Sequence, residues 1–386
     1  MKLRIVVDEN IPLAREAFGV FGEVTLAPGR KIDARMLASA DVLIVRSVTR
    51  VHEQLLADSP VRFVGTATIG TDHVERAALE RRGIAFASAP GCNARSVAEY
   101  VVAALLELEP ELQRDWRGRT IGIVGVGNVG SRVAQLAAAL GLRVLACDPP
   151  RAASEPGFAS VPLAQILAEA DVVTVHVPLV RGGAHPTHHL LGAAEIARLR
   201  PGVLVFNSSR GGVVDDVALQ AACAAGRAYA VLDVWETEPD PDAALLDVVR
   251  LATPHIAGYS LDGKIAGTRM IAESLQRFLG GAPSPAAGIY ETAVAEPRIG
   301  IAQPGRDGVR AAVRHAYAIR ADDARLRAAL ERPSGTRGEA FDHLRRDYPV
   351  RREFASYTVG GAVLGDQRDL LRALGFRLEE AAGGGT

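Results

Sequence analysis

The stretch "TIGIVGVGNVGSRVAQLAAALGLRVLACDPP", residues 120–150, joins two short apolar runs through three glycines and a helical pattern. Gly125, Gly127 and Gly130 have the spacing G-x-G-x-x-G directly after the first apolar run. The first glycine permits a tight turn, the second lets backbone amides approach a pyrophosphate, and the third lets the helix pack close to its strand. The stretch therefore predicts a strand-helix-strand unit of a doubly wound α/β fold, with a dinucleotide at the helix N-terminus.

An acidic residue ends the second apolar run. Asp148 lies about 20 residues beyond the glycines, where a carboxylate can accept hydrogen bonds from a ribose diol. The same carboxylate repels a 2'-phosphate, so NAD is favoured over NADP as the cofactor. A glycine pattern alone would also fit a tight turn that binds nothing, and Asp148 argues against that interpretation.

Short apolar runs alternate with helical patterns along most of the chain. Runs of this kind, rich in valine and isoleucine, are typical of parallel sheets covered by helices. The six runs from residue 120 onward fit a doubly wound dinucleotide-binding domain. Four runs precede them, at residues 3–9, 40–47, 61–67 and 84–89, and the six lie at residues 120–127, 142–148, 170–179, 202–209, 228–235 and 249–255.

Two long helical patterns mark the organisation into domains. Residues 94–112 form the first, and residues 262–281 form the second, which we expect to lead the chain back to the first domain. The segment "GGAPSPAAG", residues 280–288, is typical of a linker. The last hundred residues predict a small α+β domain, and the terminal "AAGGGT" has the composition of a disordered segment. The predicted domains are residues 1–93 with 257–284, residues 94–256 and residues 285–386.

Composition and charge exclude several classes of protein. The chain has 44 Lys and Arg against 45 Asp and Glu, a formal net charge of -1, so nucleic acid is not an expected partner. No apolar run approaches the length of a membrane span, and no secretory signal precedes Asp8. Three widely spaced cysteines disfavour a disulfide framework and a structural zinc site. These features indicate a reduced, cytoplasmic protein.

Three polar residues follow the last predicted strands of the dinucleotide domain, where ligands bind in doubly wound sheets. Arg210 lies in "NSSRGGVVDD", Glu238 in "LDVWETEP" and His255 in "TPHIAG". Each of them alone has an ordinary structural explanation, as a surface arginine, a solvated acid or a hydrogen-bonded histidine. Their joint position beyond strand ends predicts a catalytic set.

The chemistry of this set suits the oxidation of a 2-hydroxy acid. A histidine titrates near neutral pH, so His255 can take the hydroxyl proton while hydride leaves for the nicotinamide. Glu238 can bind the other ring nitrogen and stabilise the imidazolium that forms. The planar fork of Arg210 can hold a carboxylate and polarise the oxygen on the neighbouring carbon.

A second polar cluster follows the predicted strand at residues 40–47. In "RSVTR", residues 46–50, two arginines and two hydroxyl residues gather at the strand end. Cations with hydroxyl donors suit a phosphate, so we expect Arg46 in particular to bind a phosphorylated substrate. Solvated loop charges are the alternative interpretation, because arginines are common on surfaces.

Two further groups invite a chemical interpretation but favour a structural one. Cys92 has no evident base beside it and is expected to be a small buried residue. His185, His188 and His189 lie in a loop rich in glycine and proline, and hydride transfer needs no metal. The sequence therefore predicts no metal site.

The motifs "GIVGVGNVG", "NSSRGGVVDD", "LDVWETEP" and "TPHIAG" together resemble those of the D-2-hydroxyacid dehydrogenase family. The resemblance covers residues 1 to about 280. It implies a flavodoxin-like substrate domain into which a Rossmann NAD domain is inserted, with Arg210, Glu238 and His255 as the catalytic set. The last hundred residues, notably "RADDARLR" and "FDHLRRDYPVRREF", are similar to a dimerisation domain in the family, which implies a homodimer through residues 285–386.

The resemblance also implies contacts with both ligands. Ser47, Thr68 and Tyr259 would bind substrate, beside the Arg46 expected from the strand-end cluster. Where the family's motif often has threonine, this chain has Val177, so a cofactor contact there must use the backbone. The other residues expected to bind NAD are Gly125, Gly127, Asn128, Val129, Gly130, Asp148, Ser208, Ser209, Arg210, Asp233 and Gly258.

The closest resemblance, in stretches such as "FVGTATIGTDHV" and "HIAGYSLDGKIAGT", is to a member of the family that oxidises a phosphorylated four-carbon 2-hydroxy acid with NAD. Two alternatives stay open. The chain could be another 2-hydroxy acid dehydrogenase, such as one for 3-phosphoglycerate, or a dinucleotide-sensing regulator that has kept the fold. The joint presence of the catalytic set favours an enzyme over the regulator.

Overall fold

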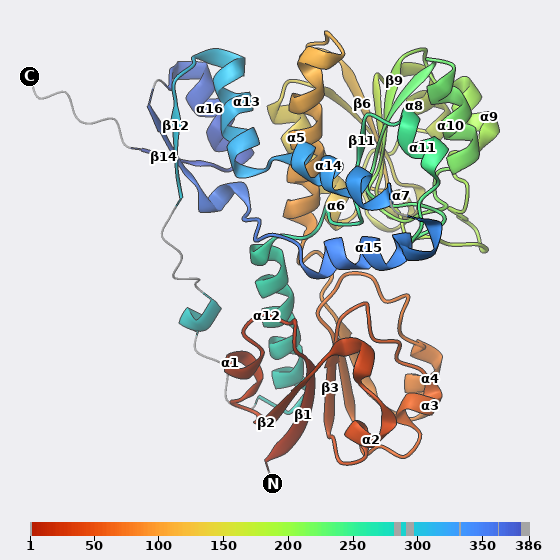
Figure 1. Ribbon diagram of the computed structural model, residues 1–386, viewed down its shortest axis with the longest axis vertical. Coiled ribbons are helices and arrows are strands. Elements are labelled where there is room, and N and C mark those ends of the chain that lie inside the picture. Colours follow the sequence, from red (N-terminus) through yellow and green to blue (C-terminus); the bar gives the residue numbers. More distant parts are fainter. Residues whose placement is uncertain (1, 282–286, 291–296, 332, 362, 380–386) are drawn as a thin grey trace, which may run out of the picture. The chain divides into compact units, whose positions relative to one another are not determined.

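A computed structural model describes residues 2–281, 287–290, 297–331, 333–361 and 363–379 (Figure 1). The chain divides into two compact units, Met1–Asn93 with Ser260–Ala295 and Ala94–Tyr259 with Glu296–Thr386. Most of the predicted linker and the terminal "AAGGGT" lie outside the described residues. The division into three domains expected from the sequence stays a prediction.

The first unit is built on a five-stranded parallel sheet with the order β2-β1-β3-β4-β5. This order is that of flavodoxin-like folds, so the expected flavodoxin-like architecture is confirmed. The strands are β1 (Leu3–Asp8), β2 (Gly22–Ala27), β3 (Val42–Val45), β4 (Phe63–Thr66) and β5 (Ala85–Ser88). The helices are α1 (Ala14–Phe18), α2 (Ala34–Leu37), α3 (Glu53–Leu56), α4 (Arg76–Arg81) and α12 (Leu261–Phe278).

Strand β2 was not expected from the sequence. It lies at the edge of the sheet, where it pairs with β1. Buried positions are few along this strand, because one of its faces remains partly exposed. An edge strand with so little apolar character gives a weak signal in the sequence.

The second unit contains all six strands expected after residue 120, in a parallel sheet with the order β11-β10-β9-β8-β6-β7. Successive strands lie on both sides of β6, so the sheet is doubly wound as predicted. Its strands are β6 (Thr120–Val124), β7 (Arg143–Cys147), β8 (Val172–Val175), β9 (Val203–Asn207), β10 (Ala228–Leu232) and β11 (Leu251–Ala252). Its helices are α5 (Ala94–Glu111), α6 (Asn128–Ala139), α7 (Pro149–Ser154), α8 (Leu163–Glu169), α9 (Ala193–Arg198), α10 (Asp216–Ala224) and α11 (Ala243–Val248).

The described residues from 297 to 379, called the C-terminal segment, belong to the second unit. This segment has its own three-stranded sheet, with the order β12-β13-β14 and parallel pairing throughout. Helices and strands are both present, as expected of a small α+β domain. The strands are β12 (Arg298–Ile301), β13 (Thr358–Gly361) and β14 (Arg377–Leu378). The helices are α13 (Gly305–Ala316), α14 (Ile319–Leu330), α15 (Ser334–Arg346) and α16 (Gly365–Leu374).

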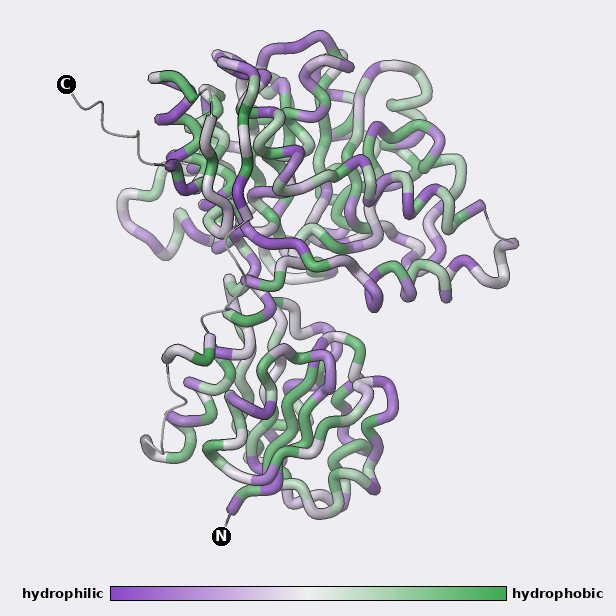
Figure 2. The backbone as a smooth tube through the Cα atoms, turned by 60° about the vertical axis from the view of Figure 1, so that its left-hand side comes forward, coloured by the Kyte–Doolittle hydropathy of each residue, from purple (hydrophilic) through white to green (hydrophobic). Residues whose placement is uncertain are grey.

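Helix α5 connects the core of the dinucleotide-binding sheet to the C-terminal segment. It packs against both α6 and α13, and most of its residues are buried. Its apolar side chains share one hydrophobic cluster with Val309 and Val313 of α13. Figure 2 shows the hydrophobic residues gathered in the strands and in the helices that cover them. No helix within the described residues is both long enough and apolar enough to cross a membrane.

Candidate active site

The glycine turn between β6 and α6 has the tight geometry that the sequence predicts. Gly125 has φ +84°, and a Cβ at this residue would lie 2.6 Å from the carbonyl oxygen of His176 and from Cγ1 of Val177. A Cβ on Gly130 would lie 2.0 Å from the carbonyl oxygen of Gly125. Gly127 precedes α6, and open space surrounds its Cβ position. The turn thus leaves room at the N-terminus of a twelve-residue helix, where backbone N–H groups favour an anion.

Asp148 directly follows strand β7 and lies beside this turn. Its Oδ2 accepts a hydrogen bond from the Val126 backbone N–H at 2.8 Å, and its Oδ1 accepts one from the Arg151 backbone N–H at 2.9 Å. The guanidinium of Arg151 pairs with Glu155 at 2.7 Å. Each carboxylate oxygen of Asp148 can accept a second hydrogen bond, so it fits the proposed contact with a ribose diol.

Hydrogen bonds fix the loop that carries Arg210 at the end of β9. Asn207 Oδ1 accepts hydrogen bonds from the N–H of Ser209 at 3.1 Å and from its hydroxyl at 2.9 Å. Asn207 Nδ2 donates to the carbonyl oxygen of Arg210 at 3.0 Å. The hydroxyl oxygen of Ser208 is buried without a hydrogen-bond partner in the protein, so it can accept or donate a bond to a ligand.

Gly211 lets this loop lie directly against the loop after β10. A Cβ on Gly211 would lie 1.9 Å from the carbonyl oxygen of Trp235 and 2.9 Å from the backbone nitrogen of Glu236. No other residue can approach the backbone so closely. The glycine that follows Arg210 therefore places the arginine's loop beside the loop that carries Glu238.

Glu238 and His255 form a hydrogen-bonded pair. Glu238 Oε2 and His255 Nδ1 are 2.9 Å apart, and Glu238 Oε1 accepts the backbone N–H of Trp235 at 3.0 Å. Burial by itself raises the pKa of Glu238, because it disfavours the carboxylate. His255, the Trp235 backbone N–H and Arg345 stabilise the carboxylate more strongly, so the pKa of Glu238 is lowered. A carboxylate fixed at Nδ1 leaves Nε2 of His255 to face a substrate.

The backbone around His255 is held in an unusual conformation by Asp233. His255 has φ +58°, in the left-handed region that non-glycine residues seldom adopt. Asp233 is 1% exposed and accepts three hydrogen bonds from this loop, from the Thr253 hydroxyl at 2.6 Å and from the N–H groups of Ile256 and Ala257 at 2.8 Å. The carboxylate that the family resemblance assigns to NAD thus positions the loop of His255.

The expected substrate residues of the first unit lie on adjacent strand ends. Ser47 follows β3 and Thr68 follows β4, and these strands pair in register. Thr68 Oγ1 donates to the carbonyl oxygen of Gly70 at 3.0 Å. Arg46 Nε donates to Asp8 Oδ2 at 3.2 Å, and Asp8 is fully buried. The guanidinium expected to bind phosphate therefore already pairs with a carboxylate.

Tyr259, the expected substrate residue of the second unit, lies against the C-terminal segment. The guanidinium carbon of Arg345, on α15, is 5.8 Å from the centre of the Tyr259 ring. The ring of Tyr348 meets that of Tyr259 edge to face, with centres 5.8 Å apart. Sequence reasoning placed both residues only in the dimerisation-like stretch "FDHLRRDYPVRREF" and gave them no substrate role, because they lie almost 90 positions beyond Tyr259.

One group of side chains among the described residues could hold a metal ion by its composition: His189, Asp215 and Glu236. His185 and His188 are not members of it. The Nε2 of His189 lies 3.0 Å and 3.1 Å from the two oxygens of Glu236. Hydrogen bonds between the His189 ring and the neighbouring carboxylate therefore also explain why these side chains lie together.

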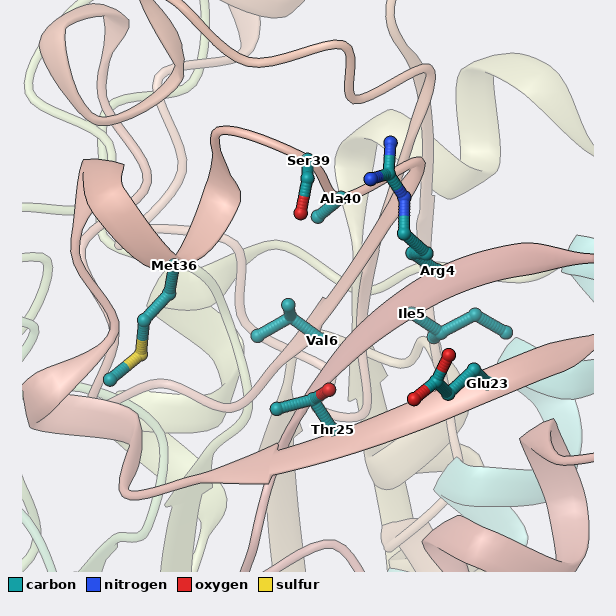
Figure 3. Close-up of a pocket in the computed structure, with 8 residues that line it drawn as sticks. All are labelled: Arg4, Ile5, Val6, Glu23, Thr25, Met36, Ser39 and Ala40. Carbon is teal, nitrogen blue, oxygen red and sulfur yellow. The ribbon is translucent and has the colours of Figure 1, made fainter.

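The first unit has a hollow of about 270 Å³, which Figure 3 shows with the residues that line it. Arg4 and Glu23, which line it, stand near the amino ends of β1 and β2. Ser47 and Thr68 follow the carboxyl ends of their strands. Because all strands of the sheet run in the same direction, the hollow lies at the amino ends of the strands, opposite to the carboxyl ends that Ser47 and Thr68 follow.

Comparisons with known proteins show which family and fold the chain resembles. The family model of the NAD-binding domain of D-isomer specific 2-hydroxyacid dehydrogenases matches residues 93–257, and a domain family of unknown function matches residues 302–375. A D-lactate dehydrogenase structure from Aquifex aeolicus, in complex with NAD and lactic acid, is 25% identical with a TM-score of 0.59. It covers 72% of this chain and 96% of its own length.

Whole-chain relatives narrow the family further. Erythronate-4-phosphate dehydrogenase of Salinibacter ruber is 48% identical over 391 residues, which cover 98% of this chain and 99% of the relative. The same enzyme of Azotobacter vinelandii is 48% identical over 386 residues, with 97% and 99% covered. The chain belongs to the erythronate-4-phosphate dehydrogenase family.

As a member of the erythronate-4-phosphate dehydrogenase family, the chain is an oxidoreductase with an NAD-binding domain. Its residues fit that cofactor. Open space at Gly127 would admit a pyrophosphate at the N-terminus of α6, Asp148 would offer acceptors to the adenosine ribose, and the buried Ser208 hydroxyl has no partner in the protein. Val177 packs against Gly125, which leaves its backbone as the group able to meet the cofactor.

Proposed function

We propose that the protein oxidises the C2 hydroxyl of 4-phospho-D-erythronate to give 2-oxo-3-hydroxy-4-phosphobutanoate, with NAD as the oxidant. This reaction is an early step toward pyridoxal phosphate. The observation that carries the proposal is the hydrogen bond between Glu238 and His255, next to the loop of Arg210, in a chain with whole-length relatives named for this activity.

The roles of the three residues follow from their chemistry. NAD, when bound, accepts the hydride from C2. His255 Nε2 takes the hydroxyl proton, and Glu238 at Nδ1 fixes the tautomer and stabilises the imidazolium. Arg210 holds the C1 carboxylate with its planar fork and polarises the C2 oxygen as the carbonyl forms. Ser47, Thr68 and Tyr259 complete the proposed substrate contacts.

The decisive assay follows NADH absorbance with 4-phosphoerythronate as sole substrate. We expect NADH to form with this acid and to form far more slowly with 3-phosphoglycerate, measured side by side. A faster reaction with 3-phosphoglycerate would replace the proposal by the alternative dehydrogenase. An unchanged rate in His255→Ala would favour a dinucleotide sensor, because that variant removes the proposed base.

We also propose that the protein works in the cytoplasm as a homodimer with an interface on the C-terminal segment. Cys92, Cys147 and Cys223 are free thiols, as a reducing compartment requires. Val350 and Leu364 of the segment are 77% and 61% exposed. An interface that covered these apolar side chains would favour association, because homodimer interfaces are rich in buried apolar area. In sedimentation velocity, Val350→Glu/Leu364→Glu should shift the chain toward monomer, while Val217→Glu, at a 76% exposed valine on α10, should not. Equal sedimentation of both variants and the wild type as dimers would place the interface elsewhere.

A further inference from the structure

The surroundings of Tyr259 include a cation that the proposed mechanism does not use. Arg345 lies near the end of α15, and its guanidinium faces the Tyr259 ring at 5.8 Å. The Nε of Arg345 is buried and has no hydrogen-bond partner in the protein. A buried N–H of a charged group without an acceptor is costly unless a ligand supplies one.

The charge on Arg345 is maintained in this position. Burial disfavours the guanidinium cation, but Tyr259 and the carboxylate of Glu238 favour it, and the pKa of Arg345 is raised. The influence is mutual, because Arg345 also lowers the pKa of Glu238. Arg345 is therefore a permanent cation close to both Tyr259 and the carboxylate that holds His255.

A cation in this position has a counterpart in the proposed substrate. The C1 carboxylate is assigned to Arg210 and the C2 hydroxyl to His255, which leaves the C4 phosphate without a partner in the second unit. A phosphate accepts charge-assisted hydrogen bonds from a guanidinium, and a tyrosine hydroxyl beside the cation can donate another. Arg46 of the first unit differs, because two of its nitrogens already face the buried Asp8.

We propose that Arg345, together with Tyr259, binds the phosphate of the substrate and selects phosphorylated over unphosphorylated 2-hydroxy acids. This inference rests on the proposed function. It assigns to the C-terminal segment a direct part in substrate recognition, in addition to its proposed part in dimerisation. Arg345 acts on binding of the distal phosphate, whereas hydride transfer at C2 depends on other residues.

The test compares two substrates that differ only by the phosphate, 4-phosphoerythronate and erythronate, in the full-length enzyme. We expect Arg345→Met to raise KM for 4-phosphoerythronate about 10- to 100-fold, as loss of a hydrogen bond to a charged group does. Its kcat/KM should fall far less with erythronate than with 4-phosphoerythronate. The matched control is Arg346→Met on the same helix, where the exposed Arg346 pairs with Asp347, and it should leave both substrates unaffected.

Two results would overturn the proposal. Equal losses with both substrates would show that Arg345 acts only by positioning Tyr259 or Glu238, and unchanged constants would remove it from the site. A loss of folding could also weaken binding, so the thermal unfolding of each variant is measured. Arg345→Lys serves as the conservative variant. A lysine keeps a point charge and should restore part of the phosphate preference, and absence of any recovery in a folded lysine variant would count against the proposal.

Failure of the proposed function can be told apart from failure of this inference. If the wild type forms no NADH with 4-phosphoerythronate, the proposed function is wrong, whatever Arg345 does. Calorimetric titration with inorganic phosphate then tests the anion site by itself. Binding to the wild type and to Arg346→Met but not to Arg345→Met supports the site, and equal binding to all three contradicts it.

Discussion

Gly211 is as important to the geometry around Arg210 as the side chain of the arginine. Any Cβ at this position would collide with the Trp235 carbonyl oxygen, so a larger residue would push the arginine's loop away from that of Glu238. Asp233 has a similar role for His255, because it accepts hydrogen bonds from both backbone N–H groups that follow the histidine. Residues that have no proposed substrate contact therefore decide where the reactive groups lie.

Replacing Arg210 by lysine should lower kcat about 100- to 1000-fold, because a point charge cannot hold a carboxylate and polarise the adjacent oxygen at once. Affinity for NAD, measured by fluorescence titration, should fall far less than kcat. Arg198→Lys, at an exposed position in the last turn of α9, is the control. A kcat for Arg210→Lys within threefold of the wild type would contradict the proposed role.

Arg46→Ala should destabilise the first unit by about 3 kcal/mol in chemical denaturation, because it leaves the buried Asp8 carboxylate without its cation. Removing both charges in Asp8→Asn/Arg46→Met should restore most of that loss. The phosphate role expected from the sequence requires that KM also rise in the double variant. A normal KM there would assign Arg46 to structure alone.

The elements place the candidate site at the carboxyl ends of parallel strands. Arg210 follows β9, Glu238 follows β10 and His255 follows β11, and these three strands are neighbours in one sheet. The glycine turn follows β6 in the same sheet. A parallel arrangement brings these loops to one edge even though more than 100 residues separate the first from the last.

Two glycines of the turn should respond differently to the same change. Gly130→Ala should lower the thermal unfolding midpoint, because its Cβ would overlap the Gly125 carbonyl oxygen and push α6 from β6. Gly127→Ala should unfold like the wild type, since its Cβ position is open, and should instead weaken NAD binding by occupying the space of the pyrophosphate. Equal midpoints for the two variants would disprove the packing role of Gly130.

In the whole second unit, the C-terminal segment is joined to the dinucleotide-binding part by a shared core and by ion pairs. Arg306 of α13 contacts Glu109 of α5 at 2.6 Å, and Glu99 of α5 accepts the Phe354 N–H at 3.0 Å. Deleting the segment would therefore expose α5 and remove the surroundings of Tyr259 together with any dimer interface. Point substitutions are the appropriate tests of association and of substrate binding.

The stability of the whole molecule should depend on the neutral form of His176. Burial lowers the pKa of His176 to about 3, so its contribution to stability is present above the unfolded pKa near 6.5 and is lost as pH falls toward 3. Between pH 6.5 and 5 this loss amounts to about 2 kcal/mol. His176→Asn should flatten the decline in unfolding free energy over this range, and His315→Asn, at an exposed histidine, should not. Parallel curves for wild type and His176→Asn would refute the assignment.

By itself the sequence determined the two parallel sheets and the positions of the glycine turn, Arg210, Glu238 and His255, because apolar periodicity and strand-end polar residues are local signals. Edge strand β2 and helix α15 were not predicted, since their stability comes from packing against neighbouring elements rather than from a periodic pattern of apolar residues. Only the tertiary structure decided that Asp233 holds the histidine loop, that Asp8 pairs with Arg46 and that Arg345 lies against Tyr259. Each of these contacts joins residues far apart in the chain, and their pairing depends on how the strands are ordered and packed.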